Sequence, residues 1–243
     1  MPIASLTAID VLRAGGNAVD AAVAACAVLG VVEFQSTGLG GDCFCLYAPA
    51  GGDKVIALNG SGRSAGAASI DYFEGAGLTK LDNVSPHTVT IPGAVSGWQL
   101  MLDTYGTKSF DELLRPAIRY AEEGFPVHSR VAWDCSMEED KLRRAGNRLF
   151  LPGGHALQEG ALFIQTGLAG TLRQIAAHGA DAFYTGPVAA DMVATLRAAG
   201  GLQTEEDFAN GRGAAEFVEP LQARWKGLDV WQCPPTGRAW SRS

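Results

Sequence analysis

One arginine stands in a setting that suits the binding of a carboxylate. Arg63 ends the stretch Asn59-Gly60-Ser61-Gly62-Arg63, which follows a short apolar run over residues 54–58. A guanidinium group offers a planar pair of donors that matches the two oxygens of a carboxylate, and flanking glycines allow close approach. The residues alone favour a solvated loop arginine, because such arginines are common and usually exposed, with substrate binding as the alternative.

A second candidate is the glycine-rich turn STGLGGD at residues 36–42. Nucleotide-binding turns run from a strand through glycines into a helix N-terminus, which faces the phosphates. Here the glycines instead feed an apolar run over residues 43–47. This order disfavours a site for ATP or NAD, which stays open only as an alternative.

The cysteines, the histidines and one charged run give no metal site and no pair of nucleophile and base. Cys43 and Cys45 alternate on a predicted strand and point the same way, but no histidine lies near them in the sequence. We expect free, mostly buried thiols, surface histidines, and neither metal nor cofactor. The charged run at residues 138–144 is expected to be a solvated helix face. The five cysteines and four histidines are Cys26, Cys43, Cys45, Cys135, Cys233, His87, His128, His155 and His178.

Helices and short strands must position these residues. Asn17 is the expected N-cap of a helix with Asp20 in its first turn, running to about residue 29. This helix carries almost only alanine and valine, so we expect it to be buried between a sheet and an outer helix. Strands are predicted over residues 43–48, 54–58, 88–91 and 227–232, and further helices over 93–105, 109–123, 129–144, 166–178 and 187–199.

The composition excludes several classes of partner. The chain has 243 residues, 47% of them hydrophobic, and a net charge of −7. A basic face for nucleic acid or for an anionic membrane is therefore not expected. The start shows no secretory leader, and the alanine-valine run is too short to span a membrane. We expect a cytoplasmic location, with a periplasmic or secreted one open if the N-terminus is truncated. No linker or repeat interrupts residues 1–243, which predicts a single domain.

Three motifs together carry a resemblance to a known family. They are LRAGGNAVDAAVAA at residues 12–25, STGLGGDCF at 36–44 and LNGSGR at 58–63, and DAFYTG at 181–186 follows later. The chain resembles the large-subunit region of the γ-glutamyltranspeptidase (glutathione hydrolase) family, which are N-terminal-nucleophile hydrolases. The likeness covers roughly residues 4 to 237 and stops at Arg238, so we expect a chain truncated at both ends.

The resemblance implies a fold and one site residue. The fold is α+β, the large-subunit part of a four-layer αββα sandwich that a small subunit completes. Arg63 matches the family's arginine that binds the α-carboxylate of a γ-glutamyl substrate such as glutathione. The following Ser64-Ala65-Gly66 departs from the family by lacking a proline often found there.

The resemblance also implies where the catalytic group lies. The family's nucleophile is a threonine that self-cleavage makes the N-terminus of the small subunit, and its own α-amine is the base. The acyl group then passes to water or to an amine. None of the threonines considered matches that motif: Thr7, Thr37, Thr166 and Thr236. No catalytic residue is therefore assigned, and the isolated chain is expected to be inactive.

Two alternatives stay open. Relatives of this fold hydrolyse other amides, including glutaryl side chains and oxamate, and Arg63 would suit any such substrate that carries a carboxylate. The other alternative is a non-catalytic interaction module. The absence of the other half of the sandwich would expose one side of a sheet, so we expect dependence on a partner chain.

Overall fold

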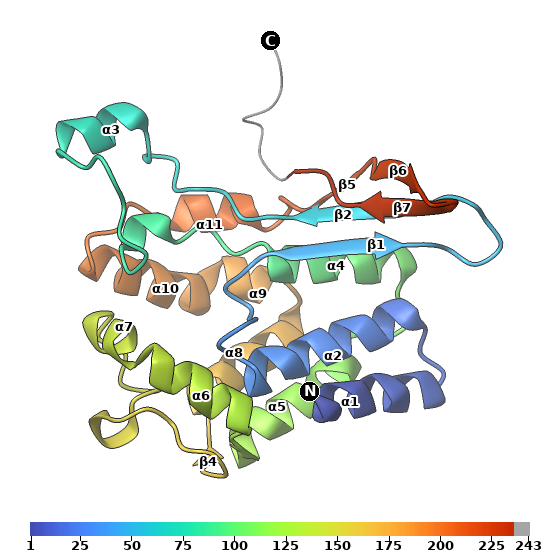
Figure 1. Cartoon of the computed structure of the whole chain (residues 1–243), viewed down its shortest axis with the longest axis horizontal. Coiled ribbons are helices and arrows are strands. Elements are labelled where there is room, and N and C mark those ends of the chain that lie inside the picture. Colours follow the sequence, from blue (N-terminus) through green and yellow to red (C-terminus); the bar gives the residue numbers. More distant parts are fainter. Residues whose placement is uncertain (236–243) are drawn as a thin grey trace.

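The computed structural model describes residues 1–235, in which helices stack on one face of a small antiparallel sheet (Figure 1). Helices α1 (Pro2–Arg13) and α2 (Ala18–Val32) form an antiparallel pair, and α2 packs on α5 (Phe110–Glu123) and α4 (Ala94–Tyr105). Asn17 begins α2 as predicted, with a capping box to Asp20. Ten residues of α2 are buried, which confirms that it is a core helix.

Helix α4, rather than α2, is the helix that packs on both strands β1 (Cys43–Tyr47) and β2 (Ile56–Gly60). Gly97 of α4 permits this approach, because a Cβ added there would lie 3.1 Å from Cys43 Cβ and 3.3 Å from Leu58 Cδ2. The sequence correctly predicted a buried α2, but it placed α2 and not α4 as the main helix against the sheet.

The sheet has the order β1-β2-β5, with β5 at Glu216–Val218 and every pair antiparallel. Leu58 of β2 is 1% exposed, whereas Phe44 and Leu46 of β1 are 45% and 41% exposed. Side chains on a strand alternate between its two faces, so one face of the sheet packs on α4 and the other presents apolar groups to solvent.

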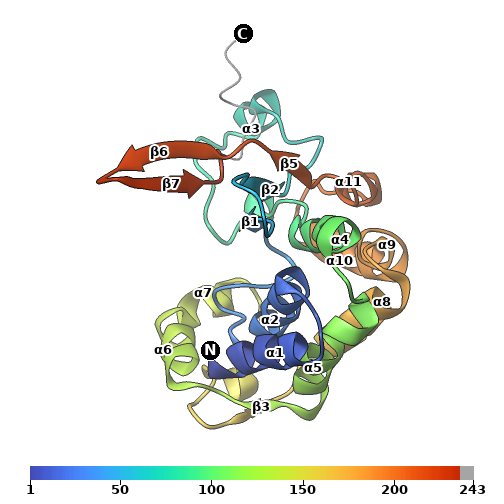
Figure 2. The ribbon, with the colours of Figure 1, turned by 90° about the vertical axis from the view of Figure 1, so that its right-hand side faces the viewer.

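A two-stranded hairpin of β6 (Leu221–Trp225) and β7 (Leu228–Gln232) projects beyond the sheet (Figure 2). Its two-residue turn has positive φ at Lys226 (47°) and Gly227 (83°), the conformation that matches the twist of a hairpin. The predicted strand over residues 227–232 is thus present. The Pro-Pro turn after it continues into residues 236–243, outside the described part of the chain.

The remaining elements complete the helical layer and its connections. They are α3 (Ile70–Gly75), α6 (Ser129–Met137), α7 (Glu139–Arg144), α8 (Thr166–His178), α9 (Asp181–Tyr184), α10 (Gly186–Ala198) and α11 (Glu205–Gly211), the short β3 (Phe125–Pro126) and β4 (Leu162–Phe163), and the 3₁₀ turns η1 (Pro86–Thr88) and η2 (Pro152–Gly154). Residues 129–144 form two helices rather than one, because the backbone at Glu138 leaves helical values.

The strand predicted over residues 88–91 is absent. The segment begins in η1 and continues as chain that belongs to no sheet, with one backbone hydrogen bond from the Ile91 N–H to the Arg63 carbonyl. The side-chain amide of Gln203 donates to the carbonyl oxygens of Pro86 (3.0 Å) and Val89 (2.7 Å), which a neighbouring strand would otherwise bind. A side chain from a distant part of the sequence thus replaces a strand partner.

Candidate carboxylate-binding site

Two of the three motifs, the glycine-rich turn at residues 36–42 and LNGSGR at 58–63, meet around the start of α4, whereas Asn17 of the first motif contacts the end of α4 at Tyr105. The carbonyl of Gly41 accepts from the backbone N–H groups of Gly93 (3.0 Å) and Ala94 (2.9 Å). The first N–H groups of a helix have no partner within the helix, and here the glycine-rich turn supplies one. The turn therefore caps α4 and presents no free helix terminus to a phosphate, which removes the basis for the nucleotide alternative.

The glycines of the LNGSGR motif are required by a close approach of two backbone segments. A Cβ added at Gly62 would lie 1.9 Å from the carbonyl oxygen of Ile91, and one at Gly93 would lie 2.1 Å from that of Gly60. These distances are far below any van der Waals contact. The space beside Gly60 and Gly62 is therefore filled by residues 91–93 and not by a ligand, in contrast to the expected role of the glycines.

Arg63 is held by its backbone while its side chain is free. Its carbonyl oxygen accepts from the Ile91 N–H at 2.7 Å. The residue is exposed, and within residues 1–235 its guanidinium makes no hydrogen bond or ion pair. It lines a pocket of about 200 Å³ together with residues that include Ser61, Ser64, Asp207 and Asn210. The pocket thus lies between the end of β2 and α11.

Two aspartates that the sequence analysis did not single out hold the chain on either side of Arg63. Asp42 Oδ1 accepts from the Gly62 N–H at 2.7 Å, and Asp207 Oδ1 accepts from the Gly66 N–H at 2.9 Å. The available signals were the position of Asp42 at the end of the glycine-rich turn and the Thr204-x-x-Asp207 capping pattern. Neither signal indicates a partner so far away in the sequence.

Comparison with known proteins follows from these motifs. The γ-glutamyltranspeptidase family profile matches residues 4–239. The chain belongs to the γ-glutamyltranspeptidase family. It is 36% identical to the glutathione hydrolase proenzyme of Bacillus subtilis over 239 residues, which are 96% of this chain and 40% of that protein. It is also 36% identical to the oxamate amidohydrolase proenzyme of Klebsiella pneumoniae over 243 residues, which are 96% of this chain and 45% of that protein.

Solved structures agree with the family and confirm the predicted fold class. Helicobacter pylori γ-glutamyltranspeptidase superposes with a TM-score of 0.89 at 32% identity, covering 97% of this chain and 68% of that one. A cephalosporin acylase from Bacillus halodurans superposes with a TM-score of 0.88 at 36% identity, covering 96% and 44%. The chain spans about two fifths of the length of the curated relatives that it matches.

In this γ-glutamyltranspeptidase family member, all five cysteines are free. Only Cys135 is fully buried and the other four are half-buried, so the prediction of mostly buried thiols is wrong. Burial, with a smaller effect of the neighbouring Cys26 and Cys45 thiols, raises the pKa of Cys43 to about 12. A thiol with such a pKa is not a nucleophile near neutral pH. Among the described residues, no group of three or more metal-ligating side chains could hold a metal ion, and no helix is long and apolar enough to cross a membrane.

The histidines and threonines occupy ordinary structural positions. His128, His155 and His178 are exposed as predicted, whereas His87 is half-buried, with its ring 5.8 Å from that of Tyr72 and 5.5 Å from that of Phe73. Thr7 is buried and donates to the Ile3 carbonyl, while Thr37 and Thr166 are exposed. Thr236 lies outside the described residues.

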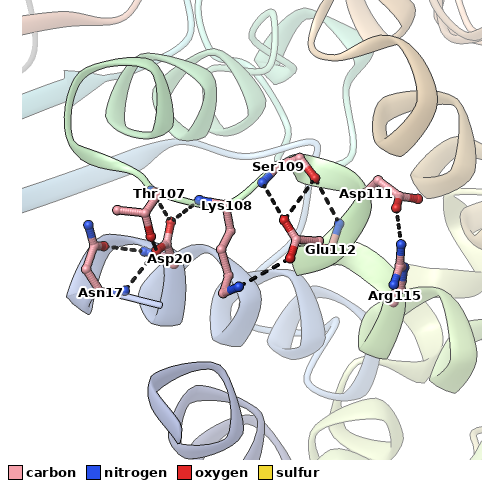
Figure 3. Close-up of polar contacts among 8 residues, drawn as sticks. All are labelled: Asn17, Asp20, Thr107, Lys108, Ser109, Asp111, Glu112 and Arg115. Carbon is pink, nitrogen blue, oxygen red and sulfur yellow. Dashed lines mark hydrogen bonds and ion pairs between the residues drawn. The ribbon is translucent and has the colours of Figure 1, made fainter. Parts of the chain in front are cut away.

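Asp20 is the most buried charge of the described chain, and its role is structural (Figure 3). Its carboxylate accepts from the backbone N–H groups of Asn17, Thr107 and Lys108 and from the Thr107 hydroxyl. Burial opposes the charge, but these hydrogen bonds outweigh burial and lower the pKa of Asp20. The carboxylate thereby ties the start of α2 to the connection between α4 and α5.

Proposed function

We propose that this chain is the large-subunit portion of a γ-glutamyltranspeptidase-like enzyme. The enzyme cleaves γ-glutamyl amides such as glutathione and passes the acyl group to water or to an amine. The nucleophile is a threonine at the N-terminus of a small subunit from the same precursor, so the isolated chain is inactive. The part played by this chain is to hold the substrate carboxylate with Arg63.

The observation that carries this proposal is a guanidinium with no hydrogen-bond or ion-pair partner among residues 1–235, on a fixed backbone. Arg63 is exposed at a pocket, while its neighbours Gly62 and Gly66 and its own carbonyl are hydrogen-bonded to three other segments. A cation that is held in place but not paired can form a two-pronged contact with a carboxylate without first breaking an internal ion pair. Family membership and the proenzyme names of the relatives support the same assignment.

Two further features support a site and a domain completed by a second subunit. The pocket of about 200 Å³ is smaller than the roughly 300–1,000 Å³ that ligand sites usually occupy. The outer face of the sheet exposes Phe44 and Leu46, and the hairpin exposes Leu221, Trp225, Leu228 and Val230. Apolar surface of this kind normally contacts another chain. In this proposal residues 1–243 are one incomplete domain that the small subunit covers. The cytoplasmic location and the lack of a nucleic-acid partner stay predictions.

The test is an assay of the chain with and without the small subunit encoded by its gene, using γ-glutamyl 4-nitroanilide. We expect no sustained release of nitroaniline from the chain alone and turnover by the assembled enzyme. Arg63→Ala in the assembled enzyme should lower kcat/KM by about 10- to 100-fold, the value of a hydrogen bond between charged groups. Arg148→Ala removes another exposed arginine and is the matched control. Turnover by the chain alone, or an Arg63→Ala variant equal to the control, contradicts the proposal.

A second candidate is an amidohydrolase or acylase of the same fold that acts on a different carboxylate-bearing amide. The specific observation is that the chain is equally identical, at 36%, to a glutathione hydrolase, an oxamate amidohydrolase and a cephalosporin acylase. Ratios of kcat/KM for γ-glutamyl 4-nitroanilide, glutaryl 4-nitroanilide and oxamate separate the two candidates. A preference for either of the last two substrates selects the second.

A further inference from the structure

We propose that Asp42 is a positioning residue for Arg63, with Asp207 as its counterpart on the other side of the loop. The inference rests on the proposed role of Arg63 in binding a carboxylate. It assigns a task to the last residue of the glycine-rich turn, which is otherwise unexplained by the site.

Hydrogen bonds connect the start of α4 to Arg63 through the glycine-rich turn. The Gly41 carbonyl is bonded to the start of α4, which places Asp42 at a fixed point next to the helix. Asp42 Oδ1 then accepts from the N–H of Gly62, the residue before Arg63, at 2.7 Å. A charged acceptor at this distance makes a strong hydrogen bond. The Gly62 N–H belongs to the peptide group that joins Ser61 to Gly62, and rotation of this group would break the hydrogen bond. Asp42 therefore sets the direction in which the chain enters Arg63.

The far side of the loop, at Gly66, is held in the same way by Asp207. Asp207 Oδ1 accepts from the Gly66 N–H at 2.9 Å, and its other oxygen accepts from the N–H and the hydroxyl of Thr204, each at 2.9 Å. Asp207 is therefore fixed by the capping box of α11 while it holds Gly66. The loop of residues 62–66 is therefore hydrogen-bonded at one end to Asp42 and at the other end to Asp207, which belong to different parts of the fold.

Both carboxylates bind backbone N–H groups of the loop and not the guanidinium of Arg63. Asp207 lines the same pocket as Arg63, and Asp42 accepts a hydrogen bond from Gly62, the residue before Arg63. Neither aspartate forms an ion pair with the Arg63 guanidinium. Because their oxygens bind backbone N–H groups, they fix the loop without competing with an incoming carboxylate. An aspartate paired with Arg63 would have to be displaced by the substrate.

The test is a double-mutant cycle between Asp42 and Arg63 in the assembled enzyme with γ-glutamyl 4-nitroanilide. Asp42→Ala should raise KM about fivefold to twentyfold and change kcat by less than about twofold, because the lost hydrogen bond acts on substrate binding. Asp42→Asn retains an oxygen acceptor for Gly62 and should restore KM to within about threefold of wild type. Asp53→Ala, an exposed aspartate of the preceding turn, is the control.

The decisive arm is Asp42→Ala in an Arg63→Ala background. If Asp42 acts only through Arg63, Asp42→Ala has no further effect on KM in the Arg63→Ala background. If Asp42→Ala instead causes a general loss of structure, its effect on KM is the same in both backgrounds. An equal effect in both backgrounds, or no effect of Asp42→Ala in the wild type, overturns the positioning role and leaves the proposed function intact. An Arg63→Ala variant with unchanged KM overturns the proposed function itself. In the assembled enzyme, hydrogen exchange of the Gly62 amide should be faster with Asp42→Ala than with Asp42→Asn, and equal rates also contradict the proposal.

Discussion

Replacing Asp20 by alanine should strongly destabilise the chain. The carboxylate is 0% exposed and accepts four hydrogen bonds, from the N–H groups of Asn17, Thr107 and Lys108 and from the Thr107 hydroxyl. The donors are only partly buried and water can reach them in part, so each lost acceptor costs about 1 kcal/mol, and partial relaxation makes the costs less than additive. We expect Asp20→Ala to lower the free energy of unfolding by about 2–4 kcal/mol.

Urea denaturation of the 243-residue chain followed by circular dichroism measures this loss. Asp10→Ala is the matched control, because it removes an exposed carboxylate from α1 that lies 3.6 Å from Arg13, and its unfolding midpoint should stay at the wild-type value. A loss below about 1 kcal/mol for Asp20→Ala would refute the view that this carboxylate joins α2 to the connection between α4 and α5.

The same carboxylate predicts the pH dependence of stability. The pKa of Asp20 is lowered in the folded state, so its contribution is complete above the unfolded value of about 3.9 and is lost as the pH falls through the folded value. Asp20→Asn does not titrate. The difference in unfolding free energy between wild type and Asp20→Asn should therefore be constant from pH 7 to about pH 4 and shrink below it. A difference that is unchanged at pH 3 would contradict this reasoning.

Two further predictions concern backbone approach and thiol reactivity. Gly62→Ala should prevent stable folding, because its Cβ would lie 1.9 Å from the Ile91 oxygen, whereas Gly38→Ala meets no atom within 4 Å and should be tolerated; equal unfolding midpoints would contradict this. Cys43 should react with iodoacetamide at pH 8 far more slowly than free cysteine, since a pKa of about 12 leaves only about one thiolate in ten thousand. Labelling of native Cys43 at the rate of free cysteine, measured by mass spectrometry, would show that the pKa of this thiol is not raised.

Local signals in the sequence predicted much of the fold. Asn17, Ser109 and Thr204 each begin a helix with a capping box, and in each case the partner lies three residues ahead, where sequence inspection can find it. The strands β1, β2 and β7 were equally recognisable, whereas β6 and the turn at residues 226–227 were not predicted. These features depend on neighbours in the sequence, so the sequence alone suffices.

Features that depend on distant partners could not be predicted in this way. An aspartate in the first turn of a helix is usually exposed. Asp20 is buried because Thr107 and Lys108, which are distant in the sequence, pack against it and donate hydrogen bonds to its carboxylate. Residues 88–91 have the composition of a strand, but the side-chain amide of Gln203 donates to the Val89 carbonyl. The glycines around Arg63 suggested an open site, whereas the approach of Ile91 fills that space. Arg63 itself was found through the resemblance, and Asp42 only through the structure.

The most direct test of the central claim is a crystal structure of the assembled two-subunit enzyme with L-glutamate bound. The account predicts that the guanidinium of Arg63 donates two hydrogen bonds to the α-carboxylate, with Asp42 still bound to the Gly62 N–H. Glutamate held by other residues, with Arg63 directed into solvent, would contradict it.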